Sequence, residues 1–179
     1  MSEIIIKRLT DPFFNSLKLQ VLQEIEDIFF ESSAKKTFKS EKEKLDLKWK
    51  YLGFYLERYP DFVWVAFSEK VLGYCLGMPI TQDDELYLAQ PHLKVFEEQY
   101  KDYPAHLHIN CHAMARGQGI GTRLIEELER EFRAMGVKGV HLMTSIDARN
   151  RKFYQRLGYD YECELPYLNT PILMMGKKL

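Results

Sequence analysis

The sequence lacks several features that are typical of secreted, membrane-bound and metal-binding proteins. It has only three cysteines in 179 residues, at Cys75, Cys111 and Cys163, and no CxxC pair. This scatter excludes a disulfide framework, and since each cysteine lies in an apolar segment, we expect buried free thiols. The start, "MSEIIIKRLT", has three consecutive strongly apolar residues, whereas a signal peptide needs about seven. The longest run, "FVWVAF", is too short to cross a membrane. We expect a cytoplasmic protein without a membrane partner.

A charge of one sign is also missing. The 25 basic and 26 acidic residues leave a net charge of −1, so no overall field attracts nucleic acid. One local group of cations consists of Arg149, Arg151, Lys152 and Arg156. It is interpreted as a solvated helix face, and we expect no nucleic-acid partner.

What the sequence does have is enough apolar material for a core, with 46% hydrophobic and 13% aromatic residues. The length favours one domain covering residues 1–179. "EIIIKRL" predicts a strand, and Asp11-Pro12 predicts the start of a helix. Ser40 with Glu43 forms a capping box that opens a second helix, which runs to about Tyr59 before Pro60. Residues 61–79 read as a hairpin with its turn at residues 68–70.

The second half continues the alternation of strands and helices. Residues 79–104 are polar, with an acidic start at Asp83, Asp84 and Glu85 that favours a solvated turn over a site for a cationic ligand. This stretch is expected to be a surface excursion with a helical patch around residues 93–100. After it come a strand "AHLHINCHAM", a helix "IGTRLIEELEREFRAMG", a strand "GVHLMTS", a helix "ARNRKFYQRLG", and the strands "YDYECEL" and "PILMMGKKL". The pattern predicts an α/β fold.

Three glycines in alternate positions, Gly117, Gly119 and Gly121, stand at the start of the helix after the "AHLHINCHAM" strand. Each weakens a helix by up to about 1 kcal/mol relative to alanine, so a reason for them is needed. A strand-to-helix crossing has free backbone N–H groups and a positive helix end, which suit an anion. The spacing is neither GxGxxG nor GxxxxGK[ST], which disfavours a dinucleotide fold and a P-loop. The alternative is a glycine-rich cap on an ordinary helix.

The six residues from Arg116 to Gly121 match the pattern Arg/Gln-x-x-Gly-x-Gly/Ala. This resembles the GNAT acetyltransferase superfamily, and the order of predicted elements is also the order of a GNAT domain. The resemblance implies a mixed, mostly antiparallel twisted sheet flanked by helices. It also implies that the turn holds the pyrophosphate of acetyl-CoA. The cofactor-binding residues expected there are Arg116, Gly117, Gln118, Gly119, Ile120, Gly121 and Thr122.

A second block, "FYQRLGYDYE", resembles the superfamily's "FYxxxGF". The resemblance implies that Phe153 packs inward, Tyr154 faces the cofactor and Gly158 ends the helix. "YPAHLHI", the glycine turn and "GVHL" are together similar to the acetyltransferase-like domain attached to O-GlcNAcases and its free-standing bacterial relatives.

The sequence departs from the superfamily pattern at three positions. Asp147 replaces a common Asn, Asn150 stands where a small residue is usual, and Ala113 replaces a common proline before the turn. Asn150 is expected to contact the cofactor.

Acetyl transfer to an amine needs a group that collects the amine's proton. His106 and His108 are candidates, because an imidazole takes up protons near neutrality. Strand periodicity predicts that both share a polar face with Asn110 and His112, while Leu107, Ile109 and Cys111 face the core. The "HLH" pair is also similar to arylalkylamine N-acetyltransferases, where such a strand pair relays protons, one residue further from the glycine turn. The alternative is that both are hydrogen-bonding residues of the strand.

The resemblance assigns the other two chemical roles. Backbone N–H groups of Ile109, Asn110 and Cys111 would polarise the thioester carbonyl where their strand splays from its neighbour. The hydroxyl of Tyr154 would donate a proton to the departing thiolate. The alternative for Tyr154 is a packing aromatic beside Phe153.

A metal site is not expected. His106, His108 and His112 extend about 20 Å along a strand, too far to share one ion. A metal site formed by a histidine pair with a distant carboxylate is left open.

Taken with the resemblance, the sequence predicts an N-acetyltransferase with acetyl-CoA as co-substrate, acting on a primary amine of a small molecule or peptide. The alternative is a catalytically silent acyl-CoA-binding or interaction domain of the same fold. Whether the chain forms a homodimer is left open.

Overall fold

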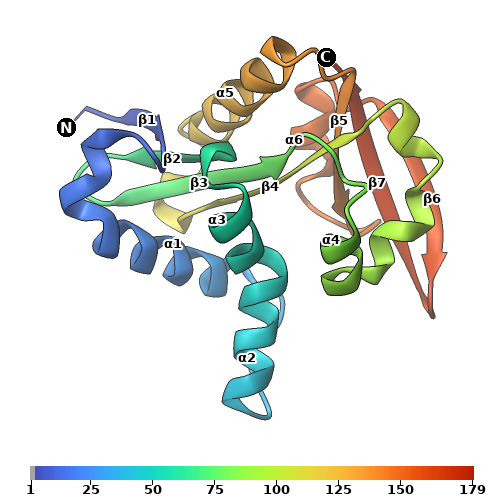
Figure 1. Ribbon diagram of the computed structural model, residues 1–179, viewed down its shortest axis with the longest axis horizontal. Coiled ribbons are helices and arrows are strands. Elements are labelled where there is room, and N and C mark those ends of the chain that lie inside the picture. Colours follow the sequence, from blue (N-terminus) through green and yellow to red (C-terminus); the bar gives the residue numbers. More distant parts are fainter. Residues whose placement is uncertain (1–2) are drawn as a thin grey trace. The chain divides into compact units, whose positions relative to one another are not determined.

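The computed structural model describes residues 3–179 and shows a seven-stranded sheet flanked by helices (Figure 1). The hydrogen-bonded order is β1-β2-β3-β4-β5-β7-β6. The strands are β1 (Ile5–Arg8), β2 (Val63–Phe67), β3 (Val71–Met78), β4 (Ala105–Cys111), β5 (Gly139–Thr144), β6 (Tyr161–Tyr167) and β7 (Thr170–Lys178). The α-helices are α1 (Lys18–Ser32), α2 (Glu41–Lys48), α3 (Phe54–Arg58), α4 (Asp84–Ala89), α5 (Ile120–Ala134) and α6 (Arg151–Arg156). The predicted mixed, mostly antiparallel α/β fold is confirmed.

The chain divides into two compact units, which are described separately. Unit 1 consists of Met1–Gly77 and His108–Leu128, and unit 2 consists of Met78–Leu107 and Glu129–Leu179. Strand β4 and helix α5 each contribute to both units. That the whole chain is one domain stays a prediction.

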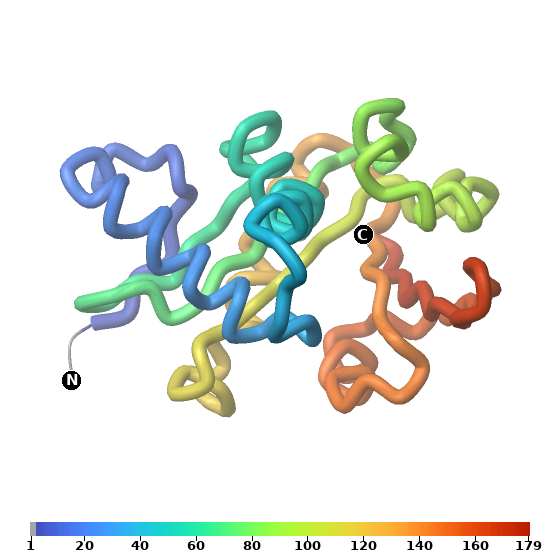
Figure 2. Tube along the Cα trace, turned by 90° about the horizontal axis from the view of Figure 1, so that it is seen from below, coloured from blue at the N-terminus to red at the C-terminus, as the bar shows by residue number. Residues whose placement is uncertain are grey.

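Unit 1 is built on the antiparallel strands β1, β2 and β3. Ile5 pairs with Phe67 and Arg8 with Trp64. The predicted hairpin is confirmed, with Ser68 N donating to Lys70 O at 3.0 Å in the turn. Helix α1 runs along one face of β2 and β3, and the first part of α5 lies on the other (Figure 1, Figure 2). Both faces of these strands are therefore covered.

The helix predicted over residues 40–59 is present but is interrupted by a π-turn. Ser40 caps it as predicted, with Oγ accepting from Glu43 N at 3.2 Å. Between α2 and α3 lies η2 (Trp49–Gly53), which has π-helical hydrogen bonding. Pro60 begins a short 3₁₀ turn, η3 (Pro60–Phe62). Single π-turns inside helices are rare and frequently occur at functional sites.

Unit 2 is built on β5, β7 and β6. Strand β7 pairs antiparallel with both β5 and β6, and these strands form a long ribbon (Figure 1). Strand β4 runs parallel to β5, with the pairs Ala105 to Val140 and His106 to His141. Parallel neighbours are typical of strands that are covered on both faces.

Residues 79–104 are not the surface excursion predicted from their polarity. They form α4, two 3₁₀ turns, η4 (Pro91–Phe96) and η5 (Gln99–Lys101), and connecting loops. Each turn buries apolar side chains, namely Leu86, Leu93, Phe96 and Tyr100. The acidic start is partly structural, because Asp83 Oδ1 accepts from Leu86 N at 2.8 Å and caps α4. The prediction that the stretch lies on the surface failed because one or two buried apolar residues per short element leave the average composition polar.

A buried carboxylate holds the end of α5 within unit 2. The side chain of Glu129 is 2% exposed, and it accepts from Tyr159 Oη at 2.9 Å and from Lys177 Nζ at 2.6 Å. Arg133 Nη2 lies 3.0 Å from the same carboxylate. Opposite charges and hydrogen bonds therefore offset the cost of burying the Glu129 carboxylate.

Replacing Glu129 by alanine should lower the free energy of unfolding by about 2–4 kcal/mol, because it leaves the buried Tyr159 hydroxyl without its acceptor and Lys177 without its counter-charge. Urea unfolding followed by circular dichroism measures this. Glu126→Ala, at an exposed position of α5, should change it by less than about 0.5 kcal/mol. Equal stability of both variants would contradict a structural role for this carboxylate.

The three cysteines are free. Cys75 is buried as predicted, whereas Cys111 and Cys163 are only half-buried. Within residues 3–179, no helix is long and apolar enough to span a membrane.

Candidate active site

The residues predicted to form the site fall into both units. His108, Ile109, Asn110, Cys111 and the turn from Arg116 to Thr122 belong to unit 1. His106, Asn150 and Tyr154 belong to unit 2. Each group is described within its own unit.

The backbone explains two of the three glycines. Gly117 and Gly119 have φ of +77° and +74°, a conformation that other residues rarely adopt. A Cβ at either position would meet no atom within 4 Å, so the glycines are not required by close packing. They are required by the left-handed backbone, and they leave open space beside the start of α5. Gly121 lies inside the first turn of α5.

The start of α5 has the electrostatics of an anion site. Its first turn contains no acidic residue, and its first N–H groups have no partner within the helix. The backbone N–H of Arg123 donates to Gly119 O at 3.1 Å, four residues before it in the chain. The amides of residues 120–122 come before this bond and have no acceptor within the helix. The partial positive charge of the helix end therefore faces the open space at Gly117 and Gly119.

The C-terminal half of β4 places His108 against two tyrosines of the helix that contains the π-turn. His108 Nε2 lies 3.3 Å from the hydroxyl of Tyr55, in α3. The ring centroids of Tyr55 and Tyr51 are 5.4 and 6.1 Å from that of His108. His108 is half-buried, so this imidazole is both oriented and accessible.

Sequence reasoning did not identify Tyr55 or Tyr51. They lie in the aromatic-rich stretch "WKYLGFY", where periodicity predicts only a helix. The π-turn changes the helical phase at Trp49–Gly53. No residue type in this stretch signals that change of phase, so the contact with His108 is visible only in the structure.

Further along β4, the side chain of Asn110 forms a hydrogen bond with a side chain of β3. Asn110 Nδ2 donates to the hydroxyl of Tyr74 at 2.8 Å, and burial raises the pKa of Tyr74 well above its usual range. Burial also raises the pKa of Cys111 to about 11, against the opposing charge of Arg116. This thiol is therefore protonated near neutrality and is not poised as a nucleophile.

His106 does not lie on the accessible polar face that strand periodicity predicts. It is 3% exposed, and its Nδ1 lies 2.9 Å from Oγ1 of Thr81, which itself donates to Pro104 O. Its ring is 5.7 Å from that of His141, which donates from Nδ1 to Tyr103 O. Alternation does not predict what covers a face, and Ala105, His106 and Leu107 are buried in succession at the start of β4.

Tyr154 is more buried than Phe153, whereas the resemblance implied that Phe153 packs inward and Tyr154 faces the cofactor. Tyr154 is 6% exposed, whereas Phe153 and Leu157 are half-buried. The ring of Tyr154 packs between Phe153 and Tyr159, with centroid distances of 5.2 and 6.0 Å. The helix α6 is short, so only one of its residues reaches full burial. Gly158 ends this segment with φ of +87°, as predicted.

Asn150 precedes α6 and lies near the end of β5. Its backbone oxygen accepts from Phe153 N at 3.0 Å, and its Oδ1 accepts from Thr144 Oγ1 at 3.5 Å. Its side chain is exposed. The arrangement leaves this side chain accessible to a ligand.

The cationic face of α6 is partly neutralised. Arg151 Nε donates to Glu162 Oε1 at 2.8 Å, and Gln155 donates to the same oxygen at 3.0 Å. The hydrogen bonds from Arg151 lower the pKa of Glu162, and those to Glu162 raise the pKa of Arg151. The arginine is thus part of a local pair in unit 2.

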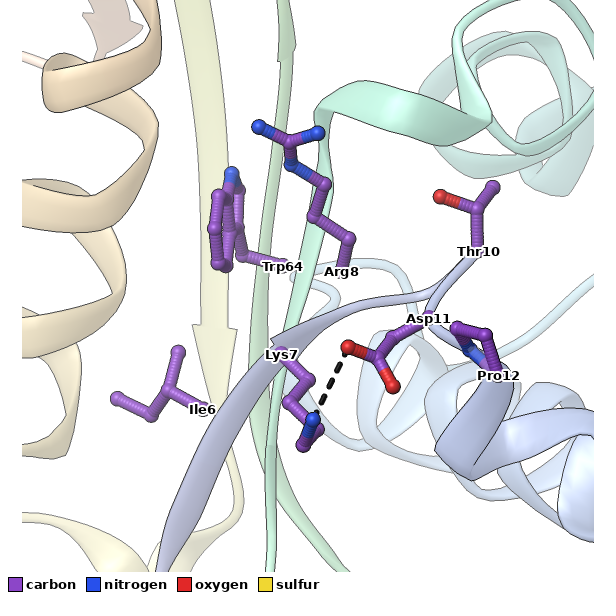
Figure 3. A pocket seen from close by; sticks show the side chains of 7 residues that line it. All are labelled: Ile6, Lys7, Arg8, Thr10, Asp11, Pro12 and Trp64. Carbon is purple, nitrogen blue, oxygen red and sulfur yellow. Dashed lines mark hydrogen bonds and ion pairs between the residues drawn. The ribbon is translucent and has the colours of Figure 1, made fainter.

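A pocket of about 480 Å³ opens at β1, and none of the predicted site residues lines it (Figure 3). Its polar side chains are engaged with one another or with neighbours. Lys7 pairs with Asp11 at 3.0 Å, Arg8 lies 5.2 Å from the ring of Trp64, and Thr10 donates to Asp61 at 2.8 Å. The backbone N–H of Phe13 and the ammonium of Lys7 lower the pKa of Asp11. These contacts pair the polar groups of Lys7, Asp11 and Thr10 without a ligand.

Within residues 3–179, no group of three or more histidine, cysteine, aspartate and glutamate side chains is placed to hold a metal ion.

Comparison with known proteins identifies the family. The model of the family described as "Acetyltransferase (GNAT) family" matches residues 19–159. The fold is similar to the crystal structure of SsHAT, with a TM-score of 0.74, 21% identity and 98% of each chain covered. It is also similar to PH1933 from Pyrococcus horikoshii OT3, with a TM-score of 0.69, 15% identity and 99% of each chain covered. A third similar structure is the polyamine N-acetyltransferase of Drosophila melanogaster, with a TM-score of 0.67, 14% identity, and 99% of this chain and 100% of that chain covered.

Proposed function

Since the chain belongs to the acetyltransferase (GNAT) family, we propose that it binds the pyrophosphate of acetyl-CoA at the turn from Arg116 to Thr122 and transfers the acetyl group to a primary amine. The observation that carries this assignment is the pair of left-handed glycines, Gly117 and Gly119, with open space beside them at the start of α5. An anion placed there meets free N–H groups and the positive helix end. A simple cap at a helix N-terminus has an extended backbone and needs no left-handed residue.

The proposed reaction is a direct transfer. The neutral amine nitrogen attacks the thioester carbonyl carbon, the new C–N bond forms and the C–S bond breaks. Backbone N–H groups of Ile109 to Cys111 stabilise the negative charge that develops on the carbonyl oxygen. His108 takes the proton that the amine loses, directly or through water, and Tyr154 gives a proton to the departing thiolate. Asn150 is proposed to contact the cofactor.

Of the two predicted bases, His108 is the better supported. Its half-buried ring is held by the Tyr55 hydroxyl, whereas His106 has the burial and contacts of a core side chain. A base must be unprotonated to act, so its contribution is lost as the pH falls. For wild type, kcat/KM should therefore decrease on the acidic side of pH 6 to 7, where imidazole ordinarily takes up a proton.

Replacing His108 by alanine should lower kcat/KM at neutral pH by about 10²-fold and remove that acidic decrease. Tyr55→Phe should leave the decrease in place, because it removes only the hydrogen bond to the imidazole. The measurement is the pH profile of thiol release. A normal rate and an unshifted profile in His108→Ala and in His106→Ala would assign the proton to water or to the substrate.

The acceptor is proposed to be a small molecule or a peptide with a primary amine. The similar Drosophila enzyme catalyses the formation of N-acetylagmatine, which makes polyamines one class to try first. A finer relationship, to the acetyltransferase-like domain of O-GlcNAcases and its bacterial relatives, is supported only by "YPAHLHI", the glycine turn and "GVHL". The cytoplasmic location and a homodimer stay open predictions.

A catalytically silent acyl-CoA-binding domain is the alternative. Both functions predict binding of acetyl-CoA, and turnover separates them. Thiol release should be measured with polyamines, agmatine, amino sugars, aminoglycosides and peptides as acceptors. Release that depends on an added amine supports the enzyme, and binding without release across the whole panel supports the silent domain.

A further inference from the structure

His112 joins β4 to the glycine turn, and its ring lies between a backbone amide and a carboxylate of unit 1. Nδ1 accepts from the backbone N–H of Met114 at 3.2 Å. Nε2 lies 3.7 Å from Oε2 of Glu31, near the end of α1. The backbone N–H of His112 donates to Leu72 O on β3 at 2.9 Å. Because Nδ1 accepts, the ring proton is on Nε2, where it faces the carboxylate.

The segment that His112 caps is short and exposed at its centre. The 3₁₀ turn η6 (Ala113–Ala115) is a single turn, and the Met114 side chain is 72% exposed. The first N–H groups of a helical turn have no partner within it and need an acceptor from outside. The imidazole supplies that acceptor for Met114.

The same turn is connected directly to the glycines. Met114 O accepts from Nε2 of Gln118 at 2.8 Å, and Arg116 N donates to Ala113 O at 3.3 Å. Gln118 lies between Gly117 and Gly119, whose backbone has the widest conformational freedom. Hydrogen bonds therefore run from His112 through Met114 to Gln118, the residue between the two left-handed glycines.

We propose that His112 is a positioning residue for acetyl-CoA binding, whose imidazole cap on Met114 holds the glycine turn in the conformation that receives the pyrophosphate. This inference rests on the proposed function. Without the cap the turn samples other conformations, and the apparent affinity falls by the fraction of molecules that remain competent. His112 does not touch the reacting atoms in this proposal, so the effect is on binding and not on the chemical step.

The first test compares two substitutions at this position. His112→Ala removes the acceptor and should raise the Kd and the KM for acetyl-CoA about three- to tenfold, the range expected for loss of one side-chain cap. The kcat at saturating acetyl-CoA should stay within about twofold of wild type. His112→Asn offers an amide oxygen to the N–H two residues on, as in an Asx turn, and should restore most of the affinity. His92→Ala, at a histidine in η4 of unit 2, is the matched control.

A compensating variant tests the mechanism independently of the side chain's chemistry. His112 has φ of −52° and ψ of 143°, outside the α region that a following proline disfavours. Ala113 is the first residue of η6, where proline is tolerated and fixes φ. His112→Ala combined with Ala113→Pro should therefore regain most of the affinity that His112→Ala loses. Amide hydrogen exchange at Met114 in the free protein should be faster in His112→Ala than in wild type.

The outcomes separate the two proposals. Titration calorimetry of wild type with acetyl-CoA comes first, and absence of binding would overturn the proposed function and this inference together. Binding by wild type that is equal in His112→Ala would overturn only the positioning role. A loss in His112→Ala that is equally large in His112→Asn and is not restored by the added proline would also overturn it, because the defect would then not be the missing restraint on the turn.

Discussion

Replacing Tyr154 by phenylalanine should lower kcat for acetyl transfer by about 10² to 10⁴, the range of a proton transfer made by a positioned side chain. The change removes one hydroxyl and keeps the ring, which packs against Phe153 and Tyr159 in unit 2. If the hydroxyl protonates the departing thiolate, its contribution arises mainly in the transition state. The affinity for acetyl-CoA should then be nearly unchanged, and kcat and kcat/KM should fall together.

The buried position of Tyr154 makes its control necessary. A tyrosine that is 6% exposed could affect the rate through packing alone. Tyr167→Phe removes a hydroxyl from β6 of the same unit and should leave kcat within about twofold of wild type. Steady-state rates are compared on an acceptor for which chemistry limits turnover. Equal rates for Tyr154→Phe and wild type would show that Tyr154 is a packing residue and that the thiolate leaves without its proton.

Elements whose ends are fixed by local chemistry could be predicted from the sequence. Ser40 with Glu43 gave the start of a helix, and the turn after Phe67 gave a hairpin, because a side-chain cap and a tight turn involve only neighbouring residues. The buried residues of α4 and η4 could not be found in this way. Each of these short turns buries apolar side chains, and burial there depends on what unit 2 packs against it.

In the candidate site, too, features set by neighbouring residues could be predicted, whereas contacts with distant segments could not. The left-handed backbone at Gly117 and Gly119 follows from the residue type, since glycine alone adopts it without strain. The burial of His106 and the contact of Tyr55 with His108 could not be predicted. Alternation along a strand predicts which residues share a face, but it does not say what covers that face. The partners of β4 come from distant segments, and one of them is shifted in phase by the π-turn.

Replacing Gly119 by valine should abolish detectable binding of acetyl-CoA, a loss of at least about 100-fold, or about 2.7 kcal/mol. Valine has a β-branched side chain, which disfavours φ of +74° by about 1–3 kcal/mol. A Cβ at this position meets nothing within 4 Å, so the side chain would occupy the open space proposed for the pyrophosphate. Strain and exclusion therefore act in the same direction, and titration calorimetry measures their sum.

Gly136 provides a control with the same backbone. Its φ is +73°, and a Cβ there also meets nothing within 4 Å. It follows the C-terminal end of α5, where no phosphate is expected. Gly136→Val should therefore have a similar cost in stability, seen in urea unfolding, but should bind acetyl-CoA as wild type does. If a folded Gly119→Val variant binds acetyl-CoA with unchanged affinity, the cofactor's pyrophosphate does not lie at this turn. If both variants lose binding equally, the loss reports general destabilisation and the assignment of the turn fails.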